Sequence, residues 1–478
     1  MFYGNHEGTV RQGCLTPSDY GITRMFYSNH EGTVRQGCRT PSDYGIIFSM
    51  ALKKKRKQPA WEKLDNTALL FPVIATEGMS NVYRLSACMT EEIDPEALSE
   101  AQEKVLSQFL GFRMRLRAGF FWYYFEENDR PLPEVREEND FPGAYINKSR
   151  NNQYLFRITY YRKRINLEVF HALTDGFGGL VLLKELVYQY LRIKHPEILE
   201  VEKDKISSGI FLDKEDSYLK NFKHAKGRDV AYKSRKAITL KGEKIPKGQL
   251  GVVHGILPFA QLKTAAKAHG ITLNQYLVGT FVYAIYREVL KGDPSDVPIN
   301  CCVPVDLRSY YDSHTMKNFF AMVSAIFKPE KDEYSYEEVL AIVAESLKSQ
   351  TTPEHLNDIL SYNVSNETNK FLRPIPLFIK NIAIKKVYDA TAYGTTSTVT
   401  NVGRIELREP YRPYVENFYA MLSMSKGQNI KGAVLSYNDK MIITFTTILA
   451  DLSVLRRFFK CLTADGVECA IETNGVWD

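Results

Sequence analysis

Hydrophobic and polar residues follow two different periods along the first half of this chain. Residues 164–170 alternate apolar and polar side chains, which predicts a half-buried strand, and residues 153–161 supply a strand to pair with it. Residues 94–110 and 180–190 instead place apolar side chains at helical spacing. The first half is therefore predicted to mix helices and strands.

The second half shows the same mixture. Thr272 with Gln275, and Ser335 with Glu338, form capping boxes that mark the starts of two helices. The other elements predicted here are strands at 252–257, 297–305, 433–437 and 441–447 and helices at 259–269, 273–290 and 451–462.

The length of 478 residues exceeds what one ordinary hydrophobic core requires, so two subdomains are expected. Residues 217–248 are rich in lysine and arginine and show little apolar periodicity. We interpret them as a basic linker between an N-terminal subdomain, 50–216, and a C-terminal subdomain, 249–478. The linker could neutralise the phosphates of a cofactor or be a solvated crossing between the two halves.

Residues 1–23 and 25–47 are a direct repeat in which only three positions differ. Two copies are too few to stack as a solenoid. We therefore interpret residues 1–49 as a recent duplication, either a disordered extension or a segment upstream of the folded protein. The basic cluster at 53–57 is interpreted as a solvated tail, with a nuclear import signal as the alternative.

The composition, with 44% hydrophobic and 25% charged residues, is ordinary for a globular protein. The net charge of +6 accompanies no nucleic-acid-binding motif, so nucleic acid is not an expected partner. No apolar run approaches the ~20 residues that span a bilayer, and no signal peptide is evident. We therefore expect no membrane span and a cytoplasmic location.

The seven cysteines are scattered and show no metal-ligand spacing, which favours reduced thiols. Adjacent Cys301 and Cys302 fall in a predicted strand and are interpreted as packing residues.

The strongest chemical signal follows the predicted strand at 164–170. It reads His171-Ala172-Leu173-Thr174-Asp175-Gly176, with further glycines at 178 and 179 before the next predicted helix. A strand end followed by a glycine turn can hold an imidazole rigidly and keep it accessible. Such a histidine can take a proton from a hydroxyl or amine and later return it to a leaving group.

Spacing alone leaves three interpretations of His171 and Asp175: a structural pair, a general base with a supporting acid, and metal ligands. The metal interpretation lacks a nearby third ligand. The chain contains no Gly-x-Ser-x-Gly nucleophile elbow and no Gly-x-x-x-x-Gly-Lys phosphate loop. The glycines at 176–179 are too few for a dinucleotide-binding fingerprint.

Residues 170–179 resemble the His-x-x-x-Asp-Gly hallmark of the CoA-dependent acyltransferase superfamily. That superfamily includes chloramphenicol acetyltransferase, plant BAHD acyltransferases, alcohol acetyltransferases and the condensation domains of nonribosomal peptide synthetases. Two further landmarks of the family are similar to Pro304-Val305-Asp306-Leu307-Arg308 with Asn318-Phe319-Phe320 and to Thr400-Asn401-Val402-Gly403. Residues 61–66 and 120–123 look most like bacterial proteins of the alcohol acetyltransferase type.

The resemblance implies an α/β fold of two layers, with two chloramphenicol-acetyltransferase-like subdomains arranged as a V and a tunnel between them. His171 would lie midway along the tunnel and act as the general base. Asp175 would be structural and pair with Arg308, and Gly176 would leave clearance for substrate. The resemblance assigns no metal ligand.

The negatively charged oxygen of the reaction intermediate would be stabilised by Asn401 or by the hydroxyl of Ser397 or Thr400. Two features depart from particular branches of the superfamily. Condensation domains usually carry two adjacent histidines, but here Phe170 precedes the single histidine. The Asp-Phe-Gly-Trp-Gly motif of plant BAHD enzymes is also missing.

The resemblance therefore predicts an enzyme that moves an acyl group, with acetyl favoured, from acyl-CoA to an alcohol or amine. Acyl-CoA would be a co-substrate, no cofactor would be permanently bound, and a monomer is favoured. One alternative is a stand-alone condensation-like domain that takes acyl groups from a carrier protein. The other is a family member that binds an acyl ligand without turnover.

Overall fold

A computed structural model of the 478-residue chain describes residues 60–198, 216–222, 236–368 and 373–477. The chain divides into two units, Met1–Lys57 and Gln58–Asp478, and all that follows concerns the second. The predicted extension at 1–49, the basic cluster at 53–57 and residues 223–235 of the predicted linker lie outside the described residues.

The first sheet has the strand order β12-β2-β7-β6-β5. Its strands are β2 (Val82–Met89), β5 (Arg136–Glu137), β6 (Phe156–Tyr161), β7 (Arg164–Phe170) and β12 (Val415–Leu422). Neighbouring strands are antiparallel except β5 and β6, and Leu167 of the central strand pairs with Leu85 on one side and Ile158 on the other. The predicted strand pair is therefore confirmed, with β7 at the predicted residues.

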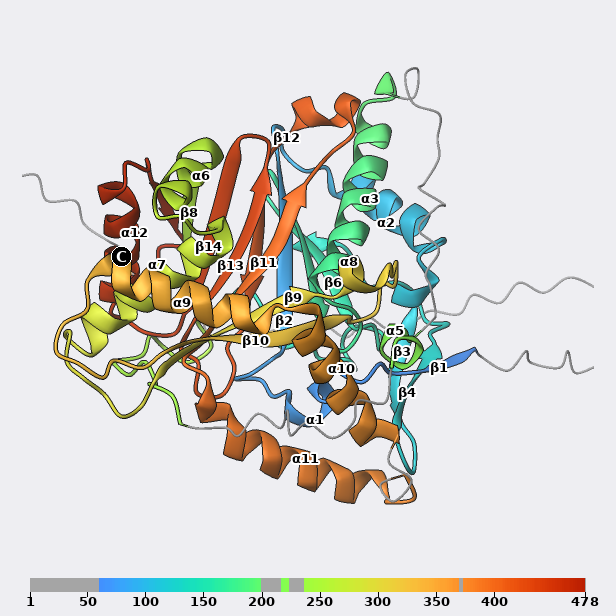
Figure 1. Ribbon diagram of the computed structural model, residues 1–478. Helices are drawn as coiled ribbons and strands as arrows, with labels where there is room; N and C mark the ends of the chain where they lie inside the picture. The colour runs from blue at the N-terminus through green and yellow to red at the C-terminus, as the bar shows by residue number, and fades with distance from the viewer. Residues whose placement is uncertain (1–59, 199–215, 223–235, 369–372, 478) are drawn as a thin grey trace, which may run out of the picture. The chain divides into compact units, whose positions relative to one another are not determined.

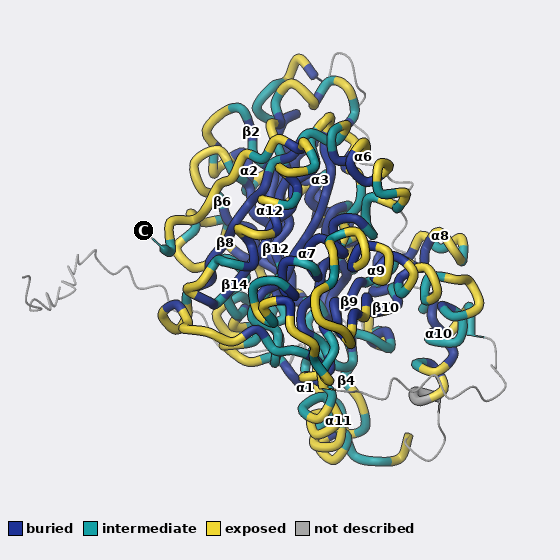
Figure 2. The backbone as a smooth tube through the Cα atoms, turned by 60° about the vertical axis from the view of Figure 1, so that its left-hand side comes forward, coloured by how far each residue is buried: buried dark blue, intermediate teal, exposed yellow. Residues whose placement is uncertain are grey.

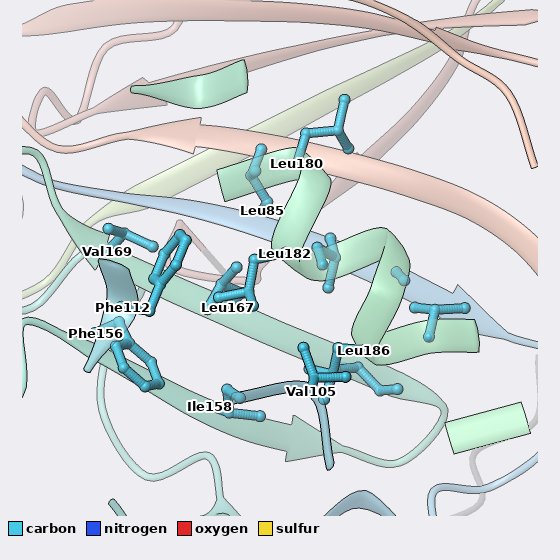
Figure 3. Close-up of a cluster of buried hydrophobic side chains, with 14 of the residues drawn as sticks. Leu85, Val105, Phe112, Phe156, Ile158, Leu167, Val169, Leu180, Leu182 and Leu186 are labelled. Carbon is cyan, nitrogen blue, oxygen red and sulfur yellow. The ribbon is translucent and has the colours of Figure 1, made fainter. Parts of the chain in front are cut away.

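Two helices, α2 (Pro95–Leu106) and α3 (Gly176–Lys194), pack beside this sheet (Figure 1). Figure 3 shows apolar side chains of the helices and of β2, β6 and β7 gathered into one cluster, among them Leu85, Leu167 and Leu186. This cluster explains the helical spacing of apolar residues in both helices, because each helix buries one stripe against the sheet.

The polar residues of β7 are buried, which makes the prediction of a half-buried strand wrong. Asn166 and Glu168 have no exposed surface. The Glu168 carboxylate accepts hydrogen bonds from the Arg84 side chain at 3.0 Å and from the Gly143 backbone at 2.6 Å, and it pairs with Arg157. Burial raises the pKa of Glu168, but the two arginines outweigh burial and hold that pKa below its usual value.

The second sheet has the strand order β10-β9-β11-β13-β14-β8-β15. Its strands are β8 (Gly251–Pro258), β9 (Ile299–Asp306), β10 (Phe320–Phe327), β11 (Ser397–Ile405), β13 (Ile430–Tyr437), β14 (Lys440–Thr447) and β15 (Ala470–Thr473). Strand β11 runs parallel to β9 and β13, and the other neighbours are antiparallel. The helices packed against one face of this sheet are α6 (Phe259–Ala268), α7 (Leu273–Val289), α9 (Tyr336–Gln350) and α12 (Ser453–Ala464) (Figure 1).

The two predicted capping boxes are confirmed. Thr272 and Gln275 cap α7, and Ser335 and Glu338 cap α9, with both reciprocal hydrogen bonds present in each case. These local signals fix where the two helices start because they satisfy backbone N–H groups that the first helical turn leaves unpaired.

The other face of the second sheet packs against the first sheet. Ala433, Leu435 and Ile442 belong to the same buried cluster as the residues of β2 and β7. Strand β12, buried in the interior in Figure 2, hydrogen-bonds to β2 and also packs on β13 and β14. The chain after residue 249 therefore completes the sheet of the chain before it, and the predicted boundary at 217–248 stays a prediction.

Parts of the predicted linker fall within the described residues and pack against the second half. The short helix α5 (Ser217–Lys220) buries Tyr218, whose hydroxyl donates to the Phe320 carbonyl at 2.7 Å. Leu240 and Ile245 are also buried.

A third sheet has the order β1-β4-β3, with β1 (Trp61–Lys63), β3 (Met114–Ala118) and β4 (Tyr123–Glu127). The remaining helices are α1 (Phe71–Ile74), α8 (Arg308–Tyr311), α10 (Pro353–Thr368) and α11 (Leu377–Thr391), with 3-10 turns η1 (Leu110–Phe112), η2 (Ala392–Gly394) and η3 (Glu409–Tyr414). Within the described part of the chain, no helix combines the length and the hydropathy that a bilayer crossing requires.

Candidate active site

His171 lies directly after β7, where the strand leaves the sheet. Its backbone N–H donates to the Asn81 carbonyl at 2.9 Å, which holds the first residue of the turn. The imidazole stacks on Phe71 with ring centroids 4.6 Å apart, and the Tyr83 ring meets it edge-on at 5.2 Å. The two aromatic rings thus hold the imidazole in place, and His171 is partly exposed to solvent.

An amide and a carboxylate orient the imidazole. Nδ1 of His171 lies 3.0 Å from Oδ1 of Asn318, and Nδ2 of Asn318 donates to Oδ2 of Asp65 at 3.0 Å. The N–H₂ group of Asn318 is used by Asp65, so its Oδ1 is the atom that faces His171. Because this oxygen can only accept, Nδ1 of His171 carries the hydrogen. The other ring nitrogen, Nε2, is then left with its lone pair.

Burial lowers the pKa of His171 below its ordinary value, although the nearby Asp175 carboxylate opposes the shift. The neutral imidazole is therefore the dominant form at neutral pH. Its single proton is on Nδ1, so Nε2 can accept a proton from a substrate.

Asp65 and Asn318 are both buried and form a rigid support. Asp65 also accepts hydrogen bonds from the backbone of Ala68 at 2.7 Å and of Asn318 at 3.3 Å. Burial raises the pKa of the Asp65 carboxyl to about 7, against the lowering effect of its hydrogen bonds. Sequence reasoning assigned no role to either residue, although both lie in segments that carry the family resemblance.

Asp175 is the N-cap of α3, and its carboxylate pairs with Arg308. Its carboxylate caps the helix by accepting from the backbone of Phe177 at 3.1 Å and Gly178 at 3.3 Å. Nη2 of Arg308 donates to both carboxylate oxygens, at 2.8 and 3.0 Å, and the Phe319 backbone donates at 3.0 Å. The two residues that the resemblance paired therefore lie together in a buried ion pair.

Arg308 has further partners that fix its position. It donates to the carbonyls of Thr315 at 2.9 Å and Lys317 at 2.7 Å, and to the half-exposed Asp306 carboxylate at 2.9 Å. Its guanidinium also lies 4.4 Å from the centroid of the Phe177 ring. The contacts of Arg308 thereby hold the segment after β9 against the turn that follows His171.

Three glycines of the turn differ in what surrounds them. A Cβ on Gly178 would approach the Met316 carbonyl to 2.6 Å, and a Cβ on Gly179 would approach the Tyr83 hydroxyl to 2.5 Å. A Cβ on Gly176 would meet no atom within 4 Å. Gly178 and Gly179 thus permit close packing of the helix start, whereas Gly176 borders open space.

The three oxyanion candidates lie together on β11, and their role stays a prediction. Ser397 is buried at the start of β11, and its hydroxyl donates to the Ile430 carbonyl at 2.7 Å. Asn401 is exposed, and its side chain accepts from the Gly403 backbone at 2.9 Å within a β-bulge. Thr400 is half-buried between them. Among the described residues, no hydrogen bond joins any of the three to His171.

A cavity of about 510 Å³ lies beside the turn that follows His171. It is lined by Leu173 and Thr174 of the turn, by Met316 and Lys317, and by residues of β1, η1 and β4, but His171 itself does not line it. Within the residues that the structure describes, no cluster of histidine, cysteine, aspartate or glutamate could hold a metal ion. The site is therefore built from one histidine, its support and an adjoining cavity.

Neither a family model nor a curated protein sequence matches this chain. Solved structures do match it. Polyketide synthase associated protein 5 from Mycobacterium tuberculosis superposes with a TM-score of 0.51 at 15% identity, over 84% of this chain and 96% of that chain. TRI101 from F. sporotrichioides, complexed with coenzyme A and T-2, gives 0.55 at 10% identity, over 85% and 97%.

A mutant starter condensation domain of rhizomide synthetase RzmA, in complex with C8-CoA, superposes with a TM-score of 0.52 at 12% identity, over 85% of this chain and 94% of that chain. At these identities the likeness concerns the fold. The described chain therefore shares the two-subdomain α/β fold of the condensation domains and of TRI101.

Proposed function

We propose that this protein is an acyltransferase that moves an acyl group from acyl-CoA to an alcohol or amine, with His171 as the general base. The observation that carries the proposal is the hydrogen-bonded series from Asp65 through Asn318 to Nδ1 of His171. It leaves Nε2 as an unprotonated nitrogen on a rigid, partly exposed ring.

In the proposed reaction, Nε2 of His171 takes the proton of the acceptor hydroxyl while the acceptor oxygen attacks the thioester carbonyl carbon. A carbon–oxygen bond forms, and the carbonyl oxygen becomes an oxyanion. Collapse of this intermediate breaks the carbon–sulfur bond, and the imidazolium returns the proton to the CoA sulfur. The products are an ester, or an amide for an amine acceptor, and free CoA.

Two structural neighbours support CoA as the carrier of the acyl group, because one holds coenzyme A and the other C8-CoA. Acyl-CoA would be a co-substrate, with no permanently bound cofactor. Acetyl remains the favoured acyl group and an alcohol the favoured acceptor from the sequence resemblance alone.

Among the oxyanion candidates, Thr400 is the one that we favour. The hydroxyl of Ser397 already donates to the Ile430 carbonyl, and Asn401 is exposed to solvent. Thr400 lies two residues after Thr398 on β11, on the face of the second sheet that is turned toward the first sheet.

The test is product analysis by mass spectrometry after incubation with mixed acyl-CoAs and a library of alcohols and amines. We expect an acylated product from the wild type and none above background from His171→Ala. The matched control is His195→Ala, which removes a histidine that contacts Glu91 and Glu197 outside the site. Equal product from wild type and His171→Ala would refute the assignment.

The same experiment separates two alternatives. Transfer from an acyl carrier protein but not from free acyl-CoA would indicate a condensation-like domain. Binding of acyl-CoA without product across the whole library would indicate a family member that binds an acyl ligand without turnover.

A further inference from the structure

A row of polar side chains crosses the second sheet on the face turned toward the first sheet. Cys302 of β9 pairs with Thr398 of β11, and the pairing of Val399 with Gly432 brings the preceding residues, Thr398 and Lys431, side by side. Lys431 in turn pairs with Thr446 of β14. Further along, the same face carries Thr444, hydrogen-bonded to His254, and then the apolar Ala433, Leu435 and Ile442.

Lys431 is the only cation of this row, and it is only 8% exposed. Its ammonium donates to the Ser425 hydroxyl at 2.6 Å. Within the described residues, no carboxylate forms an ion pair with it. A buried ammonium without a counter-charge is unfavourable, because its loss of hydration is not compensated.

The same face of the second sheet reaches the proposed base, because the ring of Phe320 on β10 lies 5.9 Å from the His171 ring between centroids. After burial, which lowers the pKa of His171 most and which Asp175 opposes, the charge of Lys431 contributes a further lowering. Burial also lowers the pKa of Lys431 itself to about 8, with a small opposing effect from Cys302. The side chain is therefore still mainly charged at neutral pH.

We propose that Lys431 binds a carboxylate carried by the substrate, so that acyl transfer at His171 selects substrates with a carboxylate near the reacting group. This inference rests on the proposed function. The Thr398 hydroxyl, which donates to the Gln428 side chain at 2.7 Å, and the Ser425 hydroxyl give the same region further polar groups. A single buried ammonium matches one small anion better than the several phosphates of CoA.

The carboxylate has two sources, and the assay separates them. One arm compares 3-hydroxy acids of increasing chain length with their methyl esters as acceptors of an acetyl group from acetyl-CoA. The other arm compares succinyl-CoA with butyryl-CoA as donors to a neutral alcohol. We expect kcat/KM for the acid to exceed that for its neutral match in one arm, which identifies where the carboxylate resides.

Lys431→Met keeps the length of the side chain and removes its charge. We expect it to lower the ratio of acid to neutral kcat/KM by roughly 100-fold. The control is Lys440→Met. Lys440 begins β14, at the opposite end of that strand from Thr446, and its variant should keep the wild-type ratio. Lys431→Gln repeats the test if the methionine variant does not fold.

The inference is overturned if the wild type shows no preference for acids in either arm, or if Lys431→Met lowers acid and neutral rates alike. Calorimetric binding of 3-hydroxy acids and succinyl-CoA to His171→Ala separates this outcome from failure of the proposed function. Weaker binding of one of these acids after Lys431→Met in that background supports the carboxylate site even without turnover. Unchanged binding of both counts against the site whatever the enzyme does.

Discussion

At the scale of single residues, the orientation of one imidazole depends on an amide and a carboxylate that lie far apart in the sequence. Asn318 is 147 positions from His171, and Asp65 is 253 positions from Asn318. While the Asp65 carboxyl is deprotonated, both of its oxygens accept hydrogen bonds, which leaves Asn318 and His171 one hydrogen-bonding role each. The direction of the Asn318 amide therefore sets which nitrogen of His171 carries the proton.

Asp65→Asn tests this dependence. An asparagine at this position presents an N–H₂ group where two acceptors are needed, so the Asn318 amide is expected to turn and offer its own N–H₂ to His171. We expect kcat to fall by about 100-fold, with a smaller change in KM. Steady-state kinetics and the ¹⁵N shifts of the His171 ring measure the two effects. The control is Asp451→Asn, at an exposed residue just before α12. An unchanged kcat with a shifted tautomer would contradict the proposed role.

The pH profile follows from the lowered pKa of His171. A base must be neutral to accept a proton, so kcat/KM for an uncharged substrate should rise with pH through an apparent pKa below 6.5 and then level off. The Asp65 carboxyl, with its pKa of about 7, titrates nearby, and repeating the profile with Asp65→Asn removes its contribution. A rate that falls as pH rises through this range would be inconsistent with His171 acting as a base.

The sequence nominated His171 because a strand end and a glycine turn are local patterns. Asp65 and Asn318 have no such pattern, since their roles exist only after the fold brings three segments together. The oxyanion candidates Ser397 and Asn401 were nominated by resemblance; the Ser397 hydroxyl donates to the Ile430 carbonyl, and Asn401 is exposed to solvent. Chemistry that depends on long-range contacts is thus the part that a single sequence leaves open.

At the scale of elements, the start of α3 is fastened to the chain between β9 and β10. Asp175 is both the cap of α3 and the partner of Arg308, so one carboxylate fixes the helix start and the turn after His171. Local signals predicted these elements well, including both capping boxes and the bounds of β7. The local signals did not predict that the polar face of β7 is buried. Alternation of apolar and polar residues does not show whether the polar side chains contact water or buried arginines.

Asp175→Ala should destabilise the protein by about 3–5 kcal/mol, because it leaves the buried Arg308 without its main counter-charge. Adding Arg308→Met should recover part of this loss. The free energy of unfolding in urea measures both changes. Asp306→Ala removes the half-exposed partner of the same arginine and should cost less than about 1 kcal/mol. Equal losses for the two aspartates would show that burial of the pair does not matter.

At the scale of the whole second unit, the two sheets are joined by more than a linker. Strand β12 leaves the second half of the chain and pairs with β2 along its whole length. The two-subdomain fold that the motifs predicted is confirmed, but the pairing of β12 with β2 was not predicted. The sequence patterns predicted no strand at residues 415–422, and only the assembled sheets reveal where this segment pairs.

A chain cut after residue 248 should therefore not fold into an independent N-terminal subdomain. Without β12, the edge of β2 and much of the apolar face of the first sheet would be exposed. We expect residues 50–248 alone to show poor dispersion in a ¹H–¹⁵N spectrum, and addition of residues 249–478 as a separate chain to restore it. A well-dispersed spectrum of the fragment alone would show that the first sheet folds without β12.

The central claim is that His171 takes the proton from the acceptor during acyl transfer. The most direct measurement is kcat/KM of His171→Ala with the acyl-CoA and acceptor that the wild type uses, beside the His195→Ala control. We expect a loss of roughly 1,000-fold or more for His171→Ala, with unchanged thermal unfolding, and wild-type kinetics for the control. A correctly folded His171→Ala enzyme with wild-type kcat/KM would contradict it.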